Sequence, residues 1–531
     1  MKTFFLAVTL ASALVLAGVD PSIAQAASYR QTSAPVLSWG SCDAPRLVEA
    51  GAECGTVPVP LDYAHPDGVQ IELAVSRVLH TVPDAQYQGV MLVNPGGPGA
   101  SGLTQSLLGQ FVPGGVGNAY DWIGFDPRGV GSSIPALSCD PDYFTPPATP
   151  YEPASAWIEW TNLRQAKVYA ADCATAGGEL LRHLRTVDSA KDMDRIRVAL
   201  GADTISFYGF SYGSYLGQVY GTLFPKRVRR MVLDGNVDPR AAWYQADLDQ
   251  DIAFEKTVKI FFRWVAKYRS VYHLGATQAA VEQAYYKVYE QLKAHPVDGV
   301  LGADEWNASF LDAGYYVFDW TDIAEAFASF VNDHDPVPME EFAAGVSEAG
   351  DDNGYAVYSA VGCTDAPSPT SWTTRRNDAA RTYRVAPFLT WSNTWYDAPC
   401  MSWSVPAHNH VAVNGAAVGP VLLISETFDA ATPYEGSLEV RRRFPLSILV
   451  EGVGGSTHAG SLFGVACVDN TVAAYLATGE LPPRKAGRRS DRQCPPTPQP
   501  EPEVSPRLAA RIGGTPALTR SELVPRTPGR G

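Results

Sequence analysis

The sequence has few positively charged residues for its length, and it lacks common motifs that bind zinc or a nucleotide phosphate. Its 531 residues contain 41 Lys and Arg against 56 Asp and Glu, which gives a formal net charge of −15 at pH 7. A chain without a basic stripe is poorly suited to neutralise a phosphate backbone, so no nucleic-acid partner is expected. The sequence has no Cys-x-x-Cys pair for zinc and no Gly-Lys-Ser/Thr triplet for a nucleotide phosphate. We therefore expect no metal and no cofactor.

Long hydrophobic runs are also missing, apart from one at the N-terminus. Residues 4–19 are mostly apolar and follow Lys2, and the small-residue pattern Ala24-Gln25-Ala26 comes shortly after them. This arrangement predicts a secretory signal peptide over residues 1–26. No cysteine follows the run at the cleavage point, so a lipid anchor is not predicted, and no later segment stays apolar long enough to cross a bilayer. We expect a secreted, extracellular protein with no membrane attachment after cleavage.

Cysteines are few, but an even number of them in an exported chain indicates disulfide bonds. Eight cysteines that reach an oxidising compartment are expected to form four disulfides. Their connectivity is not determined by the sequence, because eight cysteines allow about 105 pairings. We expect each cysteine to pair with its neighbour along the chain, as Cys42–Cys54, Cys139–Cys173, Cys363–Cys400 and Cys467–Cys494.

The pattern of apolar residues predicts a core that is interrupted by a helical insertion. Strand-like and helix-like segments alternate over residues 27–239, which predicts a mostly parallel sheet flanked by helices. Residues 240–400 are rich in aromatic residues at helical spacing, as expected for an inserted helical lid. Strand patterns return over residues 401–494 and complete the core. Residues 495–531 are Pro-rich, and we expect them to form a disordered tail on a monomeric protein.

One short segment indicates a catalytic nucleophile. Residues 205–208 form a short strand-like segment, and Gly209-Phe210-Ser211-Tyr212-Gly213 continues it as a Gly-x-Ser-x-Gly pattern. A serine can be presented on a sharp strand-to-helix turn only where its neighbours do not crowd it. The residues that follow fit a helix behind the turn, and the N-terminus of that helix would favour negative charge near Ser211. Ser211 is therefore the candidate nucleophile.

A serine nucleophile needs a base and an acid, and on sheets of this kind the acid and then the histidine follow the serine. His458 is the only histidine beyond the strand predicted over residues 421–424, and it lies in a loop after the next strand. The loop after residues 421–424 offers Asp429 as the acid, with Glu426 as the alternative. Asp238, after the preceding strand, is a third candidate. The alternative structural roles are a surface histidine and a turn-capping aspartate.

A loop of glycine and proline indicates an oxyanion hole. The loop over residues 94–102 directly follows a strand predicted over residues 90–93, and its glycines let the backbone approach a substrate closely. The tetrahedral intermediate of acyl transfer needs preorganised backbone amide donors. We expect one donor to be the amide of Tyr212, next after the nucleophile. The other is expected to be the amide of Gly97, with Gly96 as the alternative.

Taken in order, these motifs resemble those of the secreted α/β-hydrolase peptidases of the tripeptidyl aminopeptidase family of actinomycetes, which are related to proline iminopeptidase. The segments that carry the resemblance are 57–63, 94–102, 126–133, 209–217, 232–239, 429–433 and His458, with 467–469 and 473–476 closing the core. The resemblance covers residues 39–494 and implies an α/β-hydrolase fold in which Ser211 is the nucleophile. It implies that His458 acts as base and then acid, that Asp429 orients it and that Thr432 supports the acid. It also implies release of short N-terminal peptides, tripeptides in particular, from peptide or protein substrates.

The chain departs from the family pattern at two motif positions. Family members usually have threonine where this chain has Ser214, and a hydroxyl is retained there. Proline iminopeptidases have histidine where this chain has Pro95, so the support of that loop must differ. The run Asp126 to Ser133 is expected to be scaffold, with Asp126 and Arg128 tying loops together beneath the site.

The lid is the region where selectivity for the end of the chain would be set. An exopeptidase must pair the free amine of its substrate with a carboxylate, and our candidates in the lid are Asp365 and Glu325, with Asp319 and Asp322 as further alternatives. A carboxylesterase or lipase with the same triad is the alternative function, because acyl-transfer chemistry does not name its substrate. A binding protein that has lost catalysis on the same fold is a third possibility.

Overall fold

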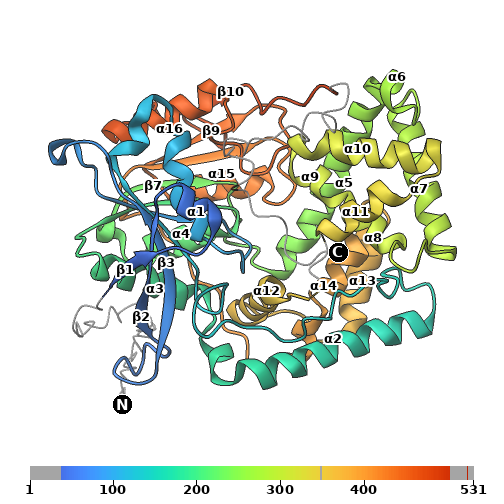
Figure 1. Ribbon diagram of the computed structural model, residues 1–531, viewed down its shortest axis with the longest axis horizontal. Coiled ribbons are helices and arrows are strands. Elements are labelled where there is room, and N and C mark those ends of the chain that lie inside the picture. The colour runs from blue at the N-terminus through green and yellow to red at the C-terminus, as the bar shows by residue number, and fades with distance from the viewer. Residues whose placement is uncertain (1–36, 347–349, 503–522, 524–531) are drawn as a thin grey trace, which may run out of the picture. The chain divides into compact units, whose positions relative to one another are not determined.

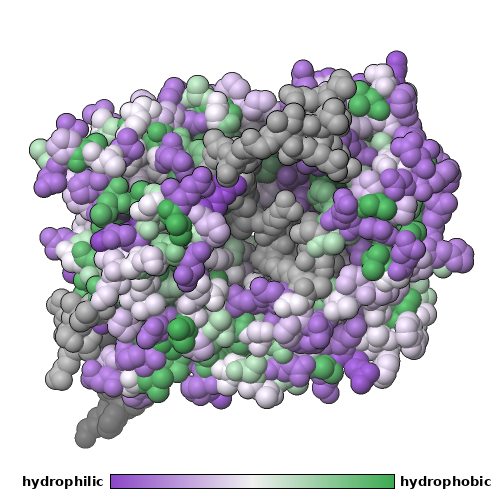
Figure 2. Space-filling model, viewed as in Figure 1, coloured by the Kyte–Doolittle hydropathy of each residue, from purple (hydrophilic) through white to green (hydrophobic). Residues whose placement is uncertain are grey.

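The computed structural model describes residues 37–346, 350–502 and 523, which all fall within one compact unit, Pro35–Gly531. The signal peptide expected over residues 1–26 and most of the expected tail lie outside the described residues. Among the described helices, none has the length and apolar composition needed to cross a membrane. Figure 2 shows hydrophilic side chains over most of one face, with hydrophobic side chains in small separate groups.

Ten strands of the described chain form one sheet in the order β1-β2-β3-β5-β4-β6-β7-β8-β9-β10 (Figure 1). The strands are β1 (Trp39–Ser41), β2 (Glu53–Pro60), β3 (Gln70–Val78), β4 (Val90–Asn94), β5 (Asp121–Phe125), β6 (Ile205–Phe210), β7 (Val228–Asp234), β8 (Val421–Glu426), β9 (Ser447–Gly452) and β10 (Arg492–Cys494). β1, β2 and β3 form an antiparallel edge that joins β5. Every pair from β5 through β10 is parallel, so the predicted mostly parallel sheet is confirmed.

The central strands are buried on both faces, and alternate residues pack into different hydrophobic clusters. Ile205 and Phe207 of β6 lie in one cluster, whereas Tyr208 and Phe210 lie in another. Alternation of this kind follows from the two-residue period of a strand. Because both faces are covered, every residue of β6 is buried, as expected in a parallel sheet.

Helices from the first and last parts of the chain cover these two faces. The longer ones are α2 (Ala156–Gly177), α3 (Thr186–Ala199), α4 (Tyr212–Leu223), α15 (Tyr434–Arg443) and α16 (Ala466–Thr478). The shorter ones are α1 (Pro45–Glu49), η1 (Asp84–Gln86), η2 (Leu103–Phe111), η3 (Pro113–Ala119), η4 (Gly178–His183) and η5 (Pro225–Arg227). Leu216 and Val219 of α4 pack in the same cluster as Phe207, whereas Val472 of α16 packs with Tyr208.

The chain between β7 and β8 is helical in the described residues. Its elements are α5 (Tyr244–Lys267), α6 (Arg269–Tyr272), α7 (Gln278–Ala294), α8 (Ala303–Ser309), α9 (Leu311–Tyr315), η6 (Val317–Asp319), α10 (Trp320–Ala328), η7 (Ser329–Asp333), α11 (Val337–Val346), α12 (Asn353–Asp365), α13 (Trp372–Tyr383), α14 (Thr390–Tyr396) and η8 (Ala398–Ser402). We call this region the cap. Helices α5 to α11 gather on the right in Figure 1.

The cap has its own hydrophobic cluster, but its helix α12 and Tyr396 of α14 pack in the core. Aromatic side chains dominate the cap cluster, with Phe261 and Trp264 of α5 packed on Trp320 of α10. Helix α12 instead contributes Tyr355 and Val357 to the cluster that contains the central strands. The cap is therefore anchored to the core through α12, although the sequence pattern alone treats residues 240–400 as one lid.

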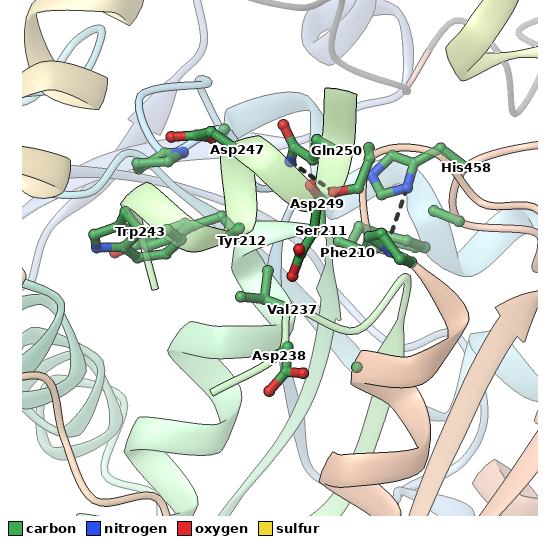
Figure 3. Close-up of a pocket in the computed structure, with 18 of the residues that line it drawn as sticks. Phe210, Ser211, Tyr212, Val237, Asp238, Trp243, Asp247, Asp249, Gln250 and His458 are labelled. Carbon is green, nitrogen blue, oxygen red and sulfur yellow. Dashed lines mark hydrogen bonds between the residues drawn. The ribbon is translucent and has the colours of Figure 1, made fainter. Parts of the chain in front are cut away.

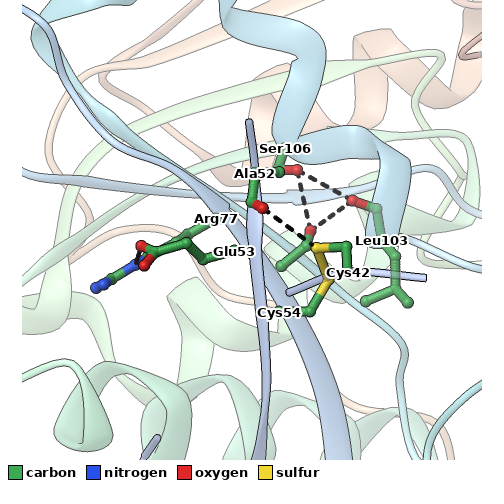
Figure 4. Close-up of a disulfide and its surroundings, with 8 residues drawn as sticks. Cys42, Ala52, Glu53, Cys54, Arg77, Leu103 and Ser106 are labelled. Carbon is green, nitrogen blue, oxygen red and sulfur yellow. Dashed lines mark hydrogen bonds and ion pairs between the residues drawn. A yellow bond between two sulfur atoms is a disulfide. The ribbon is translucent and has the colours of Figure 1, made fainter. Parts of the chain in front are cut away.

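The four disulfides pair as the order of the cysteines predicted, and no free cysteine remains in the described chain. Cys42–Cys54 ties the turn after β1 to the start of β2, beside the ion pair of Arg77 with Glu53 (Figure 4). Cys363–Cys400 joins α12 to η8 in the cap, and Cys467–Cys494 joins α16 to β10.

Candidate active site

Ser211 lies on a sharp turn between β6 and α4, with a backbone conformation that is rare for a residue with a side chain. Its φ is 56° and its ψ is −126°. A Cβ on Gly209 would lie 2.3 Å from the carbonyl oxygen of Gly213, and a Cβ on Gly213 would lie 2.5 Å from that of Asn94. Because backbone atoms cannot move aside cheaply, only glycine fits at both positions. The turn has the geometry of the nucleophile elbow that the Gly-x-Ser-x-Gly pattern predicts.

Hydrogen bonds to the next strand hold this turn in place. The amide of Ser211 donates to the carbonyl of Asp234 at the end of β7, at 3.0 Å. The hydroxyl oxygen of Ser214 accepts from the amide of Val237 at 3.0 Å. Ser214 is the position where the family usually has threonine, and the retained hydroxyl makes a bond that fixes the chain after β7. Two adjacent parallel strands therefore position the serine.

His458 and Asp429 form a buried, hydrogen-bonded pair. Nδ1 of His458 lies 2.9 Å from both carboxylate oxygens of Asp429. The His458 residue is 2% exposed and Asp429 is 1% exposed. Thr432 donates to Asp429 from its amide and from its hydroxyl, each at 2.9 Å. A carboxylate held in this way fixes the ring and keeps the proton on Nδ1.

The other nitrogen of His458 is available toward the cavity that contains Ser211. Nε2 of His458 is buried and has no hydrogen-bond partner among the described residues. His458 and Ser211 line the same cavity, and Figure 3 shows them on adjacent parts of its wall. A neutral imidazole with Nδ1 protonated presents Nε2 as a proton acceptor. This arrangement is suited to general-base chemistry at a neighbouring hydroxyl.

The histidine loop is tied to the strands by carboxylates that do not contact the imidazole. Asp234 accepts from the amide of Ser461 at 2.8 Å and also contacts its hydroxyl. Glu426, the alternative acid, accepts from the amides of Thr457 and Thr497, each at 2.6 Å. Burial raises the pKa of Glu426 to about 7. Glu426 therefore supports the backbone of the loop rather than the ring of the histidine.

Asp238, the third candidate acid, points to a different partner. It pairs with the guanidinium of Arg240 two residues further on, and Arg240 is largely exposed. Of the three acids that the sequence offered, Asp429 is the one that bonds to His458 among the described residues.

The loop after β4 lies against the elbow, where an oxyanion would form. A Cβ on Gly96 would lie 2.7 Å from the carbonyl oxygen of Phe210 and 3.1 Å from the amide nitrogen of Tyr212. The amide of Gly96 already donates to Oδ1 of Asn94 at 3.1 Å, whereas Gly97 lines the cavity. Tyr212 is the first residue of α4, so its amide has no acceptor within the helix. These positions favour Gly97 over Gly96 as the second donor.

Charged residues beneath the loop act as scaffold, as expected. Asp126 accepts from the amide of Gly102 at 2.8 Å and from the hydroxyl of Ser101 at 2.6 Å. Arg128 is fully buried and pairs with Asp192 through two nitrogens, at 2.6 and 2.7 Å. Both side chains therefore tie loops together, and neither lines the cavity that contains Ser211.

The end of helix α9 contacts the histidine directly. The amide of His458 donates to the carbonyl of Tyr315 at 2.7 Å, and the two rings meet edge to face with centroids 5.7 Å apart. The amide of Val317 donates to the hydroxyl of Thr457 at 3.4 Å. Sequence reasoning did not identify this contact, because nothing in the local pattern of α9 marks its end as a neighbour of the histidine.

The acids proposed from the sequence to bind a substrate amine lie elsewhere. Asp365, the last residue of α12, accepts from the amide of Thr186 at 2.9 Å and contacts its hydroxyl. Burial raises the pKa of Asp365 to about 6. The Thr186 hydroxyl in turn lies 2.9 Å from the hydroxyl of Tyr212. Asp365 thus supports Tyr212, the residue after Ser211, and neither Asp365 nor Glu325 lines the cavity.

The residues that do line the cavity come mainly from the chain after β7 and the chain after β8, and α9 and α12 add Tyr315 and Tyr358. Its aromatic members are Phe210, Tyr212, Trp243, Tyr315, Tyr316, Tyr358 and Tyr396, and its carboxylates are Asp238, Asp247, Asp249 and Glu435. Leu523 also lines it, and its carbonyl accepts from Nε2 of Gln105 at 2.5 Å. Ligands of open α/β sheets bind beyond the carboxyl ends of the strands. That rule would have drawn attention to Asp247, which lies in the first turn of α5, the first helix after β7.

The fold and the site define a class, and comparison with known proteins agrees with it. The model of the α/β-hydrolase fold family matches residues 89–464. The chain therefore belongs to the α/β hydrolases, and it is an enzyme of that class.

Named relatives place it more closely within the class. A tripeptidyl aminopeptidase of Streptomyces lividans is 40% identical over 478 residues, which cover 88% of this chain and 88% of that protein. The serine protease Hip1 of Mycobacterium tuberculosis is 31% identical over 480 residues, 85% of this chain and 90% of that one. A carboxylesterase B of the same species is 32% identical over 476 residues, 85% and 89% respectively. The chain therefore belongs to the same family of α/β hydrolases as the tripeptidyl aminopeptidase of Streptomyces lividans.

Proposed function

We propose that this protein is a secreted serine exopeptidase that releases tripeptides from the N-terminus of peptide and protein substrates. The observation that carries the proposal is the Asp429–His458 pair, whose imidazole shares one cavity with Ser211. The 40% identity to a tripeptidyl aminopeptidase over most of both chains supports a peptide substrate. Four disulfides are typical of a protein that folds in an oxidising compartment, which supports secretion.

In the first half of the reaction, the hydroxyl of Ser211 attacks the scissile carbonyl while Nε2 of His458 takes its proton. Asp429 keeps the ring oriented and stabilises the imidazolium that forms. The carbonyl oxygen becomes an oxyanion, which accepts from the amides of Gly97 and Tyr212. The N-terminus of α4 adds a positive electrostatic potential at the same place.

In the second half, the imidazolium gives its proton to the leaving amine, and the shortened peptide departs. The N-terminal tripeptide remains bound to Ser211 as an ester. His458 takes a proton from a water molecule, which attacks the ester, and the proton passes to the serine oxygen as the bond breaks. The enzyme returns to its starting state without a cofactor.

A carboxylesterase is the second candidate, because one relative carries that name and the triad would serve either substrate. The two functions differ in the leaving group that is tolerated and in the need for a free amine. An exopeptidase must recognise the end of the chain, whereas a carboxylesterase need not.

The experiment compares tripeptidyl p-nitroanilides that have a free or an acetylated amine with p-nitrophenyl acetate. An exopeptidase cleaves the free-amine anilide and prefers it to the acetylated one. A fluorophosphonate probe counts the active molecules and is expected to label Ser211. Turnover of the ester without any cleavage of the anilides would contradict the peptidase and leave the carboxylesterase.

A further inference from the structure

One carboxylate in the wall of the catalytic cavity differs from the others in its burial. Four carboxylates line the cavity, namely Asp238, Asp247, Asp249 and Glu435. Asp249 and Glu435 are exposed, and Asp238 pairs with Arg240. Asp247 is 8% exposed. The buried carboxylate lies in a medium of lower dielectric constant, where its attraction for a cation is stronger than at the surface.

Asp247 lies near residues that pack against the turn carrying Ser211. It lies in the first turn of α5, the helix that follows β7. Trp243, just before this helix, packs against the ring of Tyr212 with centroids 5.7 Å apart. Figure 3 shows Asp247 on the same side of Ser211 as Trp243 and Tyr212, with His458 on the opposite side. Asp247 thus lies across the nucleophile from the imidazole.

Aromatic groups surround this part of the cavity. The hydroxyl of Tyr358 donates to Oδ1 of Asp247 at 3.4 Å, so this tyrosine lies beside the carboxylate. The ring of Tyr358 packs against that of Tyr396 at 4.8 Å, and both residues line the cavity. Aromatic faces attract ammonium groups. Among the described lining residues, Arg240 is the single lysine or arginine, and Asp238 pairs with it.

We propose that Asp247 binds the free α-amino group of the substrate and thereby restricts the enzyme to the N-terminal end of a peptide. The inference rests on the proposed function and names the residue that makes the enzyme an exopeptidase. The ammonium of the substrate is bonded to the carboxylate of Asp247 and lies against the rings of Tyr358 and Trp243. A blocked amine carries no charge and cannot make this bond.

The same geometry would set the length of the released peptide. Asp247 fixes the amine at one end, and Ser211 with its oxyanion donors fixes the scissile carbonyl at the other. An extended chain advances about 3.3–3.6 Å per residue, so three residues span roughly 10 Å. A matching separation of the two ends would favour tripeptides over peptides that are shorter or longer by one residue.

The test is the selectivity of the Asp247→Asn variant. Its readout is the ratio of kcat/KM for a tripeptidyl p-nitroanilide with a free amine to that for the acetylated peptide. Asparagine has the same size but no charge, so the ratio is expected to fall about 10- to 100-fold, the effect of losing one bond between charged groups. Labelling with the fluorophosphonate counts active molecules, which keeps misfolded protein out of the ratio.

Asp249→Asn is the matched control. It removes the same charge two residues away on the same helix, from an exposed position where water and salt screen it. Its ratio is expected to change by less than about two-fold. A second variant, Asp247→Glu, retains the charge but moves it, and it should recover part of the ratio that Asp247→Asn loses.

The possible outcomes separate this inference from the proposed function. An unchanged ratio in Asp247→Asn, or an equal loss in Asp249→Asn, would overturn the assignment of Asp247 while leaving the peptidase in place. If the wild-type enzyme cleaves no anilide, the peptidase itself fails. The same free and acetylated peptides are therefore also made as p-nitrophenyl esters, on which the ratio remains measurable.

Discussion

The loops beyond the carboxyl ends of the central strands, here called the sheet edge, and the helical cap line one cavity in different ways. The sheet presents Ser211 and His458 on loops that main-chain hydrogen bonds and buried carboxylates hold in place. The cap contributes side chains that pack on one another, such as Tyr358 on Tyr396, and it contacts the histidine through Tyr315. The first arrangement fixes atoms to the precision that bond making needs. The second shapes the space beside them, so under the proposed function chemistry and selectivity would be supplied by separate regions.

The sharpest way to break this division is to remove the nucleophile. Ser211→Ala is expected to lower kcat about 10⁴- to 10⁶-fold, because alanine has no hydroxyl on which the proposed ester could form. The loss should be equally severe for anilides and esters, whether or not the amine is free, since the change touches the chemistry alone. Turnover of purified protein with each substrate measures it. A variant that lost one substrate class and kept another would show that selectivity and chemistry are not separate.

The next largest effect is expected at the acid. Asp429→Asn retains the shape of the side chain but favours the wrong tautomer of His458, and kcat is expected to fall about 10⁴-fold. Asp238→Asn is the control, because Asp238 pairs with Arg240 rather than with the histidine. Less than about a ten-fold change is expected there. Steady-state kinetics with the free-amine anilide compares the two variants, and equal losses would contradict the assignment of Asp429.

The residues of the sheet edge were predictable from the sequence because a local motif marks the serine and order along the chain marks the acid and the histidine. The elbow needs glycine at 209 and 213 for steric reasons, and the backbone distances at those positions show why. His458 and Asp429 could be proposed from their order along the chain, because a parallel sheet brings the ends of successive strands to one edge. The structure adds what order cannot provide, such as the role of Glu426 in holding the histidine loop.

The cap was predictable as a helical region but not in its contacts. Aromatic residues at helical spacing indicate buried helices, yet they do not say which helix packs on which partner. Asp365 lies in the predicted lid, but α12 packs on the core and directs this carboxylate to Thr186. Asp247 escaped notice because an acid in the first turn of a helix is usually only a favourable charge at the N-terminus.

One disulfide lies in the cap and another joins α16 to β10 of the core, so removing each in turn compares their effects on the free energy of unfolding and on the preference for a free amine. Replacing Cys363 and Cys400 by serine opens a loop of 37 residues, and the free energy of unfolding is expected to fall by about 2–4 kcal/mol. Because Cys363 is on α12, near Tyr358 along the same helix, the preference for a free amine should weaken as well. The control replaces Cys467 and Cys494, which should cost a similar free energy without altering that preference. Denaturant unfolding and the anilide ratio measure both quantities.

The smallest expected effect is the pH dependence that Glu426 gives to the core. Burial raises its pKa from 4.5 to about 7, so the folded protein holds this proton over a range in which the unfolded chain has lost it. The folded state binds more protons there, and stability must fall as the pH rises between these values. Glu426→Gln stays neutral, and the decline in unfolding free energy from pH 5 to pH 8 should shrink by about 1–3 kcal/mol. Glu480→Gln, at an exposed position, is the control. Denaturant titrations at each pH measure the free energy of unfolding. If this free energy declined equally with pH in the wild type and in Glu426→Gln, the folded protein would tolerate the charged form of Glu426, which would contradict the prediction.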